Sequence, residues 1–452
     1  MSKSTSRHIK IDPSRPSRVR LRLMQLVAVE PGEMRALCWS FTYFFALLCG
    51  YYIIRPMRDE MGIAGGVDKL QWMFTGTFLV MLAAVPLFGW VAKRFLVRQF
   101  LPYVYYFFIA NLILFFALFK SDVTHAYIAR GFFIWASVFN LFIVSVFWSF
   151  MADIFNNDQA KRLFGVIAAG GTAGALTGPV LTAILVNPLG PANMLLISAA
   201  FLAIAVWCIH RIIAWKNSVY VELSPDDRAH EANRGSGKNQ AIGGSIFAGV
   251  RLVFSSSYLA GICLLILLYT TLATFLYFQQ AQFVRDSFDN SASRTAIFAA
   301  IDFAVNFLTI VTQLLLTSRI VRKWGLHWTL ALIPLLLGVG FLMLGMMPTL
   351  SILIAVQVVR RSGNYAVMRP AREMLYVVLG KEEKYKAKNF IDTVVYRGGD
   401  AVSAWVFAGL KAMGMSLAGI ALVAIPLTAI WAWISFKLGK RQAHLATQNV
   451  RT

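Results

Sequence analysis

The chain has 452 residues, of which 58% are apolar and only 14% are charged. Soluble domains carry roughly 25% charged residues, so this composition excludes an ordinary soluble protein. The apolar residues come in runs of about twenty, the length that crosses a bilayer as a helix. The four cysteines lie within such runs and lack the spacing of a disulfide framework or a metal site. The sequence therefore predicts an all-α polytopic membrane protein.

Twelve apolar segments follow one another, each close to the ~20 residues that span ~30 Å of hydrocarbon. We predict two six-helix bundles, over residues 36–213 and 257–437, between a basic tail (1–35) and a second tail (438–452). A polar linker (214–256) joins them, and its residues 241–254 are predicted to form a helix on the membrane face. The segments are 36–54, 70–92, 99–119, 127–151, 163–185, 191–213, 257–281, 295–318, 327–347, 350–378, 390–412 and 415–437.

The formal charge of +22 would suggest a nucleic-acid partner in a soluble protein. Here the positions of the cations explain it, because 30 of the 43 Lys and Arg residues lie in the tails, the linker and alternate short loops. Only 8 lie in the connections on the other side. Cations collect on the cytoplasmic side of membrane proteins. We therefore expect both termini in the cytoplasm, the lipid bilayer as the surroundings of the spans, and no nucleic-acid partner.

The two predicted halves resemble each other. Short basic loops follow the second segment (residues 89–98) and the eighth segment (318–325). Matching loops in two six-helix halves are typical of a parallel repeat, the arrangement of the major facilitator fold. We predict that fold.

Charged side chains inside the spans are the best pointers to function, because each costs at least ~2.5–3.5 kcal/mol at the bilayer centre unless it faces a cavity or a partner. Arg360 and Arg361 fall about 15 Å into the tenth span. Arg397 and Asp400 share one face of the eleventh. Cations outnumber acids here, which favours an anionic substrate bound by arginine forks. Two alternatives stay open: the arginines only neutralise nearby aspartates, or a buried acid such as Asp302 carries a coupling proton.

Glycines recur every fourth residue of the fifth segment, at Gly170, Gly174 and Gly178, and Pro179 follows. This spacing lets a second helix approach closely. The Gly174-x-x-x-Gly178-Pro179 piece also resembles the span-5 motif of facilitator antiporters. We predict that these four residues pack helices together.

Two stretches carry a resemblance to a known family. Residues 145–164 read SVFWSFMADIFNNDQAKRLF, and residues 372–395 read REMLYVVLGKEEKYKAKNFIDTVV. Together with the group from Arg55 to Asp59, they resemble the nucleotide translocases of plastids and obligate intracellular bacteria, which are facilitator-fold exchangers of ATP for ADP. The resemblance implies a transporter for organic anions in a bacterial inner (plasma) membrane, in which Arg58, beside Asp59, contacts the substrate.

Three of the four nucleotide-binding positions that this family implies differ in charge here. Its glutamate on span 4 falls between Trp135 and Asn140, where this chain has no acid. Its glutamate on span 7 falls near the uncharged Gln279, and its lysine on span 11 aligns with Asp400. The resemblance therefore leaves the identity of the anion open.

The candidate residues fall into two functional groups. The substrate-binding candidates are Arg55, Arg58, Asp59, Asn140, Gln279, Arg360, Arg361, Asn364, Arg397 and Asp400. The coupling and gating candidates are Asp153, Lys161, Arg162, Asp302, Asn306 and Asp392.

The predicted function is secondary transport of an organic anion, such as a nucleotide or another phosphorylated solute, by exchange or proton coupling and by alternating access. The alternatives are a transporter of a lipid-linked or cell-wall precursor and a membrane sensor that transports nothing. Enzyme motifs are missing, because the six histidines form no HExxH and face no nucleophile. We expect no enzymatic activity, no cofactor or metal, and a monomer.

Overall fold

The computed structural model describes residues 29–30, 32–94, 97–121, 125–222, 252–253 and 255–451. Nearly all of these residues are helical, and no strand occurs among them. The predicted basic tail up to residue 28 and most of the predicted interfacial helix at 241–254 lie outside the described residues. The helices are α2 (Glu33–Ala64), η1 (Val67–Lys69), α3 (Leu70–Arg94), α4 (Val97–Lys120), α5 (His125–Ile154), α6 (Asn157–Leu189), α7 (Pro191–Glu222), α10 (Ser257–Ser287), α11 (Ser291–Thr312), η2 (Gln313–Thr317), α12 (Ser318–Met346), α13 (Leu350–Gly363), η3 (Asn364–Met368), α14 (Arg369–Leu375), α15 (Lys381–Phe390), η4 (Ile391–Val395), α16 (Tyr396–Ala412) and α17 (Leu417–Arg451).

Three of the spans are built from several helical pieces. The eighth runs through α11, the π-helical turn η2 and the start of α12, and it ends where Gly325 adopts φ +71°, which L side chains rarely adopt. The π-helical turns η3 and η4 divide the tenth and eleventh spans. Within the described chain, nine helical stretches are long and apolar enough to cross a membrane, and one of them, Ser291–Met346, contains two spans. With the two divided spans, the twelve-helix prediction is confirmed.

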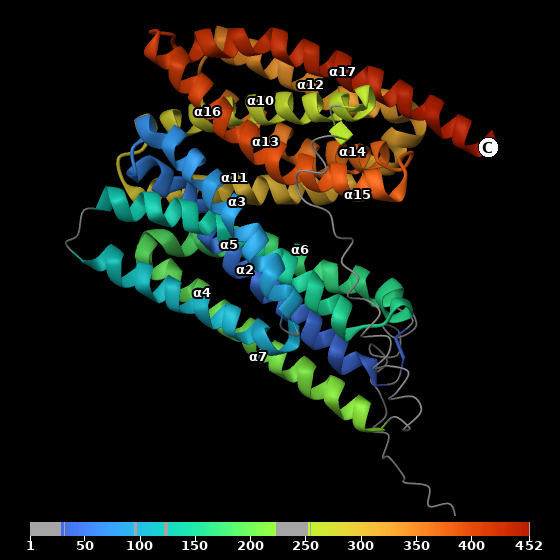
Figure 1. The fold of residues 1–452 in the computed structure, drawn as a ribbon. Helices are drawn as coiled ribbons and strands as arrows, with labels where there is room; N and C mark the ends of the chain where they lie inside the picture. Colours follow the sequence, from blue (N-terminus) through green and yellow to red (C-terminus); the bar gives the residue numbers. More distant parts are fainter. Residues whose placement is uncertain are drawn as a thin grey trace, which may run out of the picture.

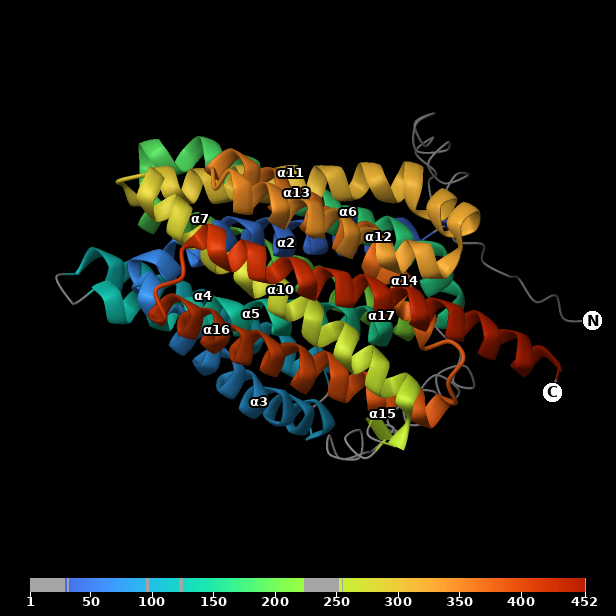
Figure 2. The same cartoon turned by 90° about the horizontal axis from the view of Figure 1, so that it is seen from above.

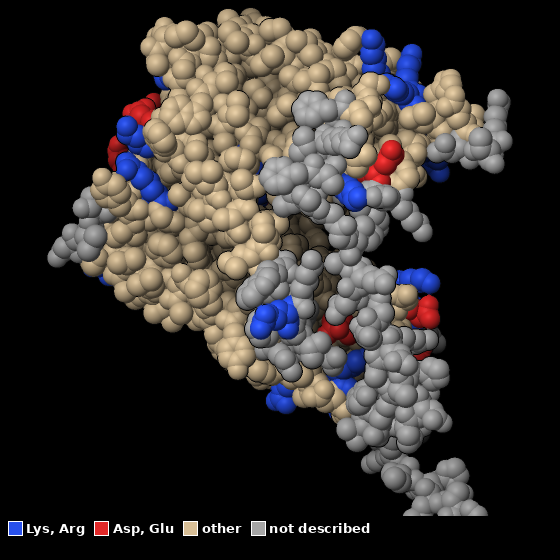
Figure 3. Space-filling model, in the orientation of Figure 1, with Lys and Arg blue, Asp and Glu red and all other residues tan. Residues whose placement is uncertain are grey.

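The helices form two bundles that lie against each other (Figure 1). Helices α2 to α7 form the lower bundle in that view and α10 to α17 the upper one. The start of α2 and the end of α17 lie at one end of the molecule, here called the termini end; the connection from α10 to α11 lies at the opposite, loop end. Seen from above, α16 lies beside α3, and α11 packs against α6 and α2 (Figure 2). The surface is hollowed between the bundles on the side of the termini end (Figure 3).

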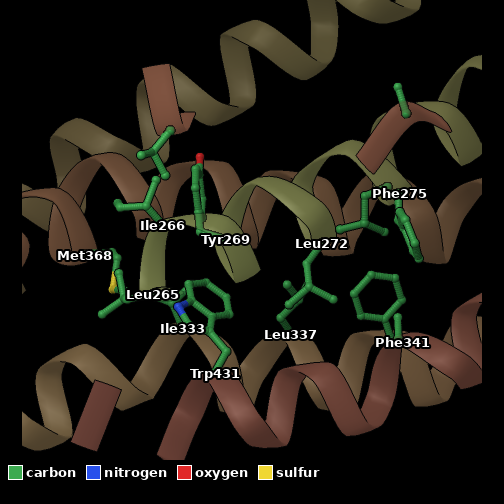
Figure 4. Close-up of a cluster of buried hydrophobic side chains, with 14 of the residues drawn as sticks. Leu265, Ile266, Tyr269, Leu272, Phe275, Ile333, Leu337, Phe341, Met368 and Trp431 are labelled. Atoms are coloured by element: carbon green, nitrogen blue, oxygen red, sulfur yellow. The ribbon is translucent and has the colours of Figure 1, made fainter. Parts of the chain in front are cut away.

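The buried apolar side chains form two clusters, one centred on each bundle. In the C-terminal bundle, one buried cluster contains Leu272 of α10, Leu337 and Phe341 of α12, and Trp431 of α17 (Figure 4). This cluster also takes in side chains of the N-terminal bundle near the loop end, where the bundles meet. Those side chains are Ile63, Val67, Leu70, Met73 and Phe133.

The glycine stripe of α6 packs directly on α2. A Cβ atom at Gly170, Gly174 or Gly178 would meet the backbone carbonyl of Phe41, Phe45 or Cys49, respectively. Both series advance by four residues, so the two helices are in backbone contact over more than two turns. Pro179 is also buried on α6. This contact holds α2, the helix that carries Arg55 and Arg58, in a fixed position.

Substitution of Gly174 by alanine tests this contact. The added methyl group meets backbone atoms that cannot rotate away, so we expect a loss of about 1–3 kcal/mol of stability and a lower melting temperature of the purified protein. Gly131→Ala on α5 is the matched control, because a Cβ there meets nothing within 4 Å. Equal melting temperatures of the two variants would contradict the close packing.

Candidate functional site

A central cavity of about 170 Å³ lies between the two bundles. Seven of its residues come from α2, α3 and α5 of the N-terminal bundle and the rest from α10, α13, η3 and α16 of the C-terminal bundle. The cavity is therefore shared by both halves, as alternating access requires of a substrate site. Its lining residues are Arg55, Arg58, Phe74, Thr77, Phe78, Phe133, Ser137, Tyr269, Ala273, Thr274, Tyr277, Arg360, Arg361, Asn364, Tyr365, Tyr396, Arg397 and Asp400.

Helix α2 brings Arg55 to the middle of the molecule. The sequence places the end of the first span near residue 54, but α2 continues through Pro56 to Ala64. Arg55 is consequently an interior residue of a 32-residue helix and lines the cavity. Its guanidinium Nη1 lies 3.5 Å from Oδ1 of Asp302 across the bundle interface, and the group also lies over the ring of Tyr52.

Asp302 on α11 is shared by two arginines. Nη2 of Arg361 donates a hydrogen bond of 2.5 Å to Oδ1 of Asp302, the same oxygen that Arg55 approaches. The aspartate is 1% exposed, and its second oxygen has no hydrogen-bond partner. One carboxylate thus faces two guanidinium groups, one from each bundle, and compensates the charge of only one.

Arg360 is held by a neutral amide instead of an acid. Its Nε and Nη2 donate to Oε1 of Gln357 at 3.1 and 2.8 Å, and Nε2 of Gln357 donates to Oε1 of Gln280 at 2.6 Å. All three side chains are buried. Within the described part of the chain, no carboxylate lies within ion-pair distance of Arg360. Its orientation is fixed while its charge stays available to the cavity.

Two further arginines each have an aspartate beside them. Arg58 is paired with Asp59, whose Oδ1 also accepts a hydrogen bond of 3.1 Å from the Tyr277 hydroxyl of the other bundle. Arg397 lies 3.6 Å from Asp400. The cavity and its immediate partners therefore hold five guanidinium groups against three carboxylates, and this excess of positive charge favours an anion.

Aromatic rings make up much of the remaining cavity wall. They come from both bundles and stand beside the arginines, so a cargo with an anionic end and a flat or apolar part has a surface for each. The rings belong to Phe74, Phe78, Phe133, Tyr269, Tyr277, Tyr365 and Tyr396.

Three other predicted residues, Asn140, Gln279 and Asn306, do not line the cavity. Asn140 on α5 does not line the cavity, and the buried Gln279 donates to the backbone carbonyl of Leu417 at 3.4 Å. Asn306 donates to the carbonyl of Ala175 in the other bundle at 2.7 Å. Their predicted roles in binding and coupling stay predictions.

The remaining coupling candidates lie towards the termini end. Arg162 binds Glu33 and so ties the start of α6 to the start of α2, while Lys161 lies 3.4 Å from Asp158 on the surface. Asp153 lies exposed near the end of α5, and Asp392 lies 3.5 Å from Arg372. None of these contacts joins the two bundles.

Sequence patterns missed several residues that matter to the geometry. Gln357, Gln280 and Tyr365 are polar residues in apolar spans, and a search for every polar group one turn from a buried arginine would have found Gln357. Glu60 and Arg294 are 234 positions apart, and no spacing rule connects them.

The bundles are locked together at the loop end. Glu60 of α2 is fully buried and binds Arg294 of α11 through two hydrogen bonds of 2.8 and 3.0 Å. The indole of Trp405 on α16 donates to the hydroxyl of Thr75 on α3 at 3.0 Å and packs edge-on against Trp72. Ion pairing and ring packing thus close the loop end, opposite the hollow.

Comparison with known sequences gives a consistent picture. A family model described as Major Facilitator Superfamily matches residues 37–371. The ADP,ATP carrier protein 1 of Chlamydia muridarum (strain MoPn / Nigg) is 22% identical over 91% of this chain and 89% of that carrier. The ADP,ATP carrier protein 3 of Rickettsia bellii (strain RML369-C) is 19% identical over 69% of this chain and 70% of that one.

Solved structures show the same fold. A bacterial homologue of the iron transporter ferroportin in its inward-facing state matches with a TM-score of 0.63 and 10% identity, covering 90% of this chain and 98% of that one. A mutant of the nucleoside transporter NupG matches with a TM-score of 0.59 and 14% identity, covering 92% and 100%. At these identities the likeness concerns the fold alone.

Replacing Glu60 by glutamine tests the loop-end lock. Loss of the carboxylate leaves Arg294 without its ionic partner, and breaking a buried pair costs roughly 3–5 kcal/mol. We expect the loop end to open more often, so that a membrane-impermeant maleimide modifies a cysteine introduced at Ala296 on α11 about tenfold faster or more.

The exposed pair of Arg285 and Asp286 at the same end provides the control, Asp286→Asn. Rates are measured against each chain without the introduced cysteine. An unchanged rate in Glu60→Gln, or an equal increase in Asp286→Asn, would show that the buried pair does not hold the loop end closed.

Proposed function

The chain belongs to the Major Facilitator Superfamily, and we propose that it exchanges a phosphorylated organic anion across a bacterial plasma membrane. Family membership and the ADP,ATP carrier relatives support a secondary transporter of a small organic solute. The anionic class is supported by the five arginines of the central cavity. Phosphoryl groups are well suited to guanidinium forks, which bind two of their oxygens at once.

The single observation that carries this proposal is the state of Arg360. An amide orients this buried guanidinium, and among the described residues no carboxylate lies at ion-pair distance, so its positive charge is not compensated. A bound anion compensates that charge, whereas a purely structural arginine has its acid already in place. Arg55, Arg361, Asn364 and Tyr365 line the same cavity and would contact the cargo beside it.

The proposed mechanism is alternating access, in which the cavity opens in turn to the two sides of the membrane. The residues 36–213 and 257–437 act as two halves that rock about the cavity. The cation distribution supports placing both termini and the hollow in the cytoplasm, so that the structure represents an inward-facing state. The protein would work as a monomer, since each chain holds a complete cavity.

Coupling follows from the ion pairs that cross between the bundles. In the inward-facing state Asp302 contacts Arg55 of the other half, and Asp59 contacts Tyr277. Rocking must break both contacts, and an anion that replaces Asp302 beside Arg55 lowers the cost of doing so. Asp400, beside Arg397, would either hold that arginine or carry a proton.

Counterflow in proteoliposomes tests the proposal. Vesicles preloaded with an unlabelled nucleotide or sugar phosphate should take up the labelled compound faster than empty vesicles do. Arg360→Gln should lower this uptake at least about tenfold, because a hydrogen bond to a charged group contributes about 1.5–3 kcal/mol. Arg285→Gln, which changes an exposed arginine at the loop end, should leave it unchanged. No acceleration across a panel of organic anions would favour a lipid-linked precursor or a sensor instead.

Gln357→Glu tests the charge of Arg360 while preserving the shape of the site. The new carboxylate would lie where the amide oxygen lies, about 3 Å from the guanidinium, and would neutralise it. We expect the KM of exchange to rise roughly tenfold or more, with the variant still monodisperse in detergent. Gln71→Glu on α3, at the loop end, is the control. An unchanged KM in Gln357→Glu would exclude Arg360 as an anion-binding group.

A further inference from the structure

A second concave surface lies on the outside of the C-terminal bundle, away from the central cavity. It is a groove of about 350 Å³ lined by Trp324, Trp328, Leu332 and Leu335 of α12. All but Leu332 are more than two-fifths exposed. Trp328, Leu332 and Leu335 follow one another at the spacing of one helix face, so the groove runs along α12.

The groove has an aromatic end and an aliphatic end. The break at Gly325 places Trp324 and Trp328 on either side of a sharp change in direction at the termini end of α12. Leu335 lies seven residues beyond Trp328, which is about 10 Å deeper towards the loop end. Indole rings prefer the boundary between headgroups and hydrocarbon, and leucine prefers the hydrocarbon. The groove therefore follows the depth profile of a bilayer leaflet.

The packing of α17 on α12 builds one wall of the aromatic end. The ring of Phe436 contacts Trp328 at 5.0 Å and His327 at 5.1 Å between centroids. Gly439 allows this approach, since a Cβ there would meet the backbone of His327. The Nζ of Lys440 then lies 4.6 Å above the ring of Phe436. Lys440 is thereby held beside the aromatic end.

Positive charge gathers at this end of the groove. Helix α12 carries Arg319, Arg322 and Lys323, all of them exposed, and the last two directly precede Trp324. Neither α12 nor α17 contains any Asp or Glu. Within the described residues, no ion pair joins Arg322, Lys323 or Lys440 to a carboxylate. The aromatic end presents cations to whatever occupies the groove.

From this arrangement we propose that the groove is a binding site for an anionic phospholipid of the surrounding membrane. The phosphate lies by Lys323 and Lys440, the glycerol region between the two indoles, and one acyl chain along Leu332 and Leu335. Charge complementarity selects anionic over zwitterionic lipids, because basic residues beside the membrane attract anionic headgroups. The site is independent of the cavity residues that bind the transported anion.

Native mass spectrometry of the full-length protein in detergent tests the site with phosphatidylglycerol and phosphatidylcholine as probes. We expect phosphatidylglycerol to bind at least about tenfold more tightly than phosphatidylcholine, and the double variant Lys323→Gln with Lys440→Gln to lose that difference. The matched control is Lys411→Gln, which removes an exposed cation at the loop end of α16. The control should keep the preference of the unchanged protein.

A second variant probes the apolar part of the groove. Leu332→Trp fills the space between the indoles and the deeper leucine without changing any charge, and it should also weaken phosphatidylglycerol binding about tenfold. The proposal is overturned if both lipids bind equally to the unchanged protein or if the control loses binding as much as the double variant does. It is also overturned if the spectra show a dimer that the groove variants dissociate, because a second copy would then occupy this face.

Discussion

Burial of guanidinium groups between two helix bundles is the constraint that shapes the rest of this molecule. A charge at the centre of a bilayer costs several kcal/mol unless it faces water or a partner. Five arginines share one cavity, and three aspartates of the described residues stand beside them. Asp302 lies beside two of these arginines at once. The aspartates therefore compensate most of the positive charge of the site, and an excess of positive charge remains. An anion-binding site needs such a residual positive charge. The charge must also be small, because burying it lowers the stability of the fold.

The hydrogen-bond partner of each arginine determines how readily that arginine could bind an anion. Arg361 has a carboxylate at hydrogen-bond distance, so an anion that bound there would have to compete with Asp302. Among the described residues, Arg360 is hydrogen-bonded to the Gln357 amide, which Gln280 supports, and no carboxylate would compete with an anion for it. An amide costs less to bury than a carboxylate and leaves the neighbouring charge intact. The two adjacent arginines of α13 are therefore not equivalent, although the sequence alone treats them as a pair.

Much of the architecture was predictable from the sequence, and the pairing of side chains was not. Apolar runs of about twenty residues specify helices because the bilayer admits little else, and the glycine spacing of α6 predicts its contact with a second helix. Helix position also indicated that Arg360 and Arg361 lie near the midplane. The depth of Arg55 was not predictable, because Pro56 normally ends a helix and here lies within α2. Partners such as Glu60 and Arg294 depend on how two bundles meet, which local periodicity does not encode.

Helix α2 connects the cavity to the loop-end lock within six residues. Arg55 and Arg58 line the cavity, Asp59 accepts from Tyr277, and Glu60 binds Arg294. The last two contacts and that of Arg55 with Asp302 all reach the C-terminal bundle. These groups share one stretch of rigid helix that packs backbone to backbone on α6. Any shift of Arg55 and Arg58 along this helix therefore also moves Asp59 and Glu60. Under the proposed function, occupation of the cavity and release of the loop end would therefore be linked through α2.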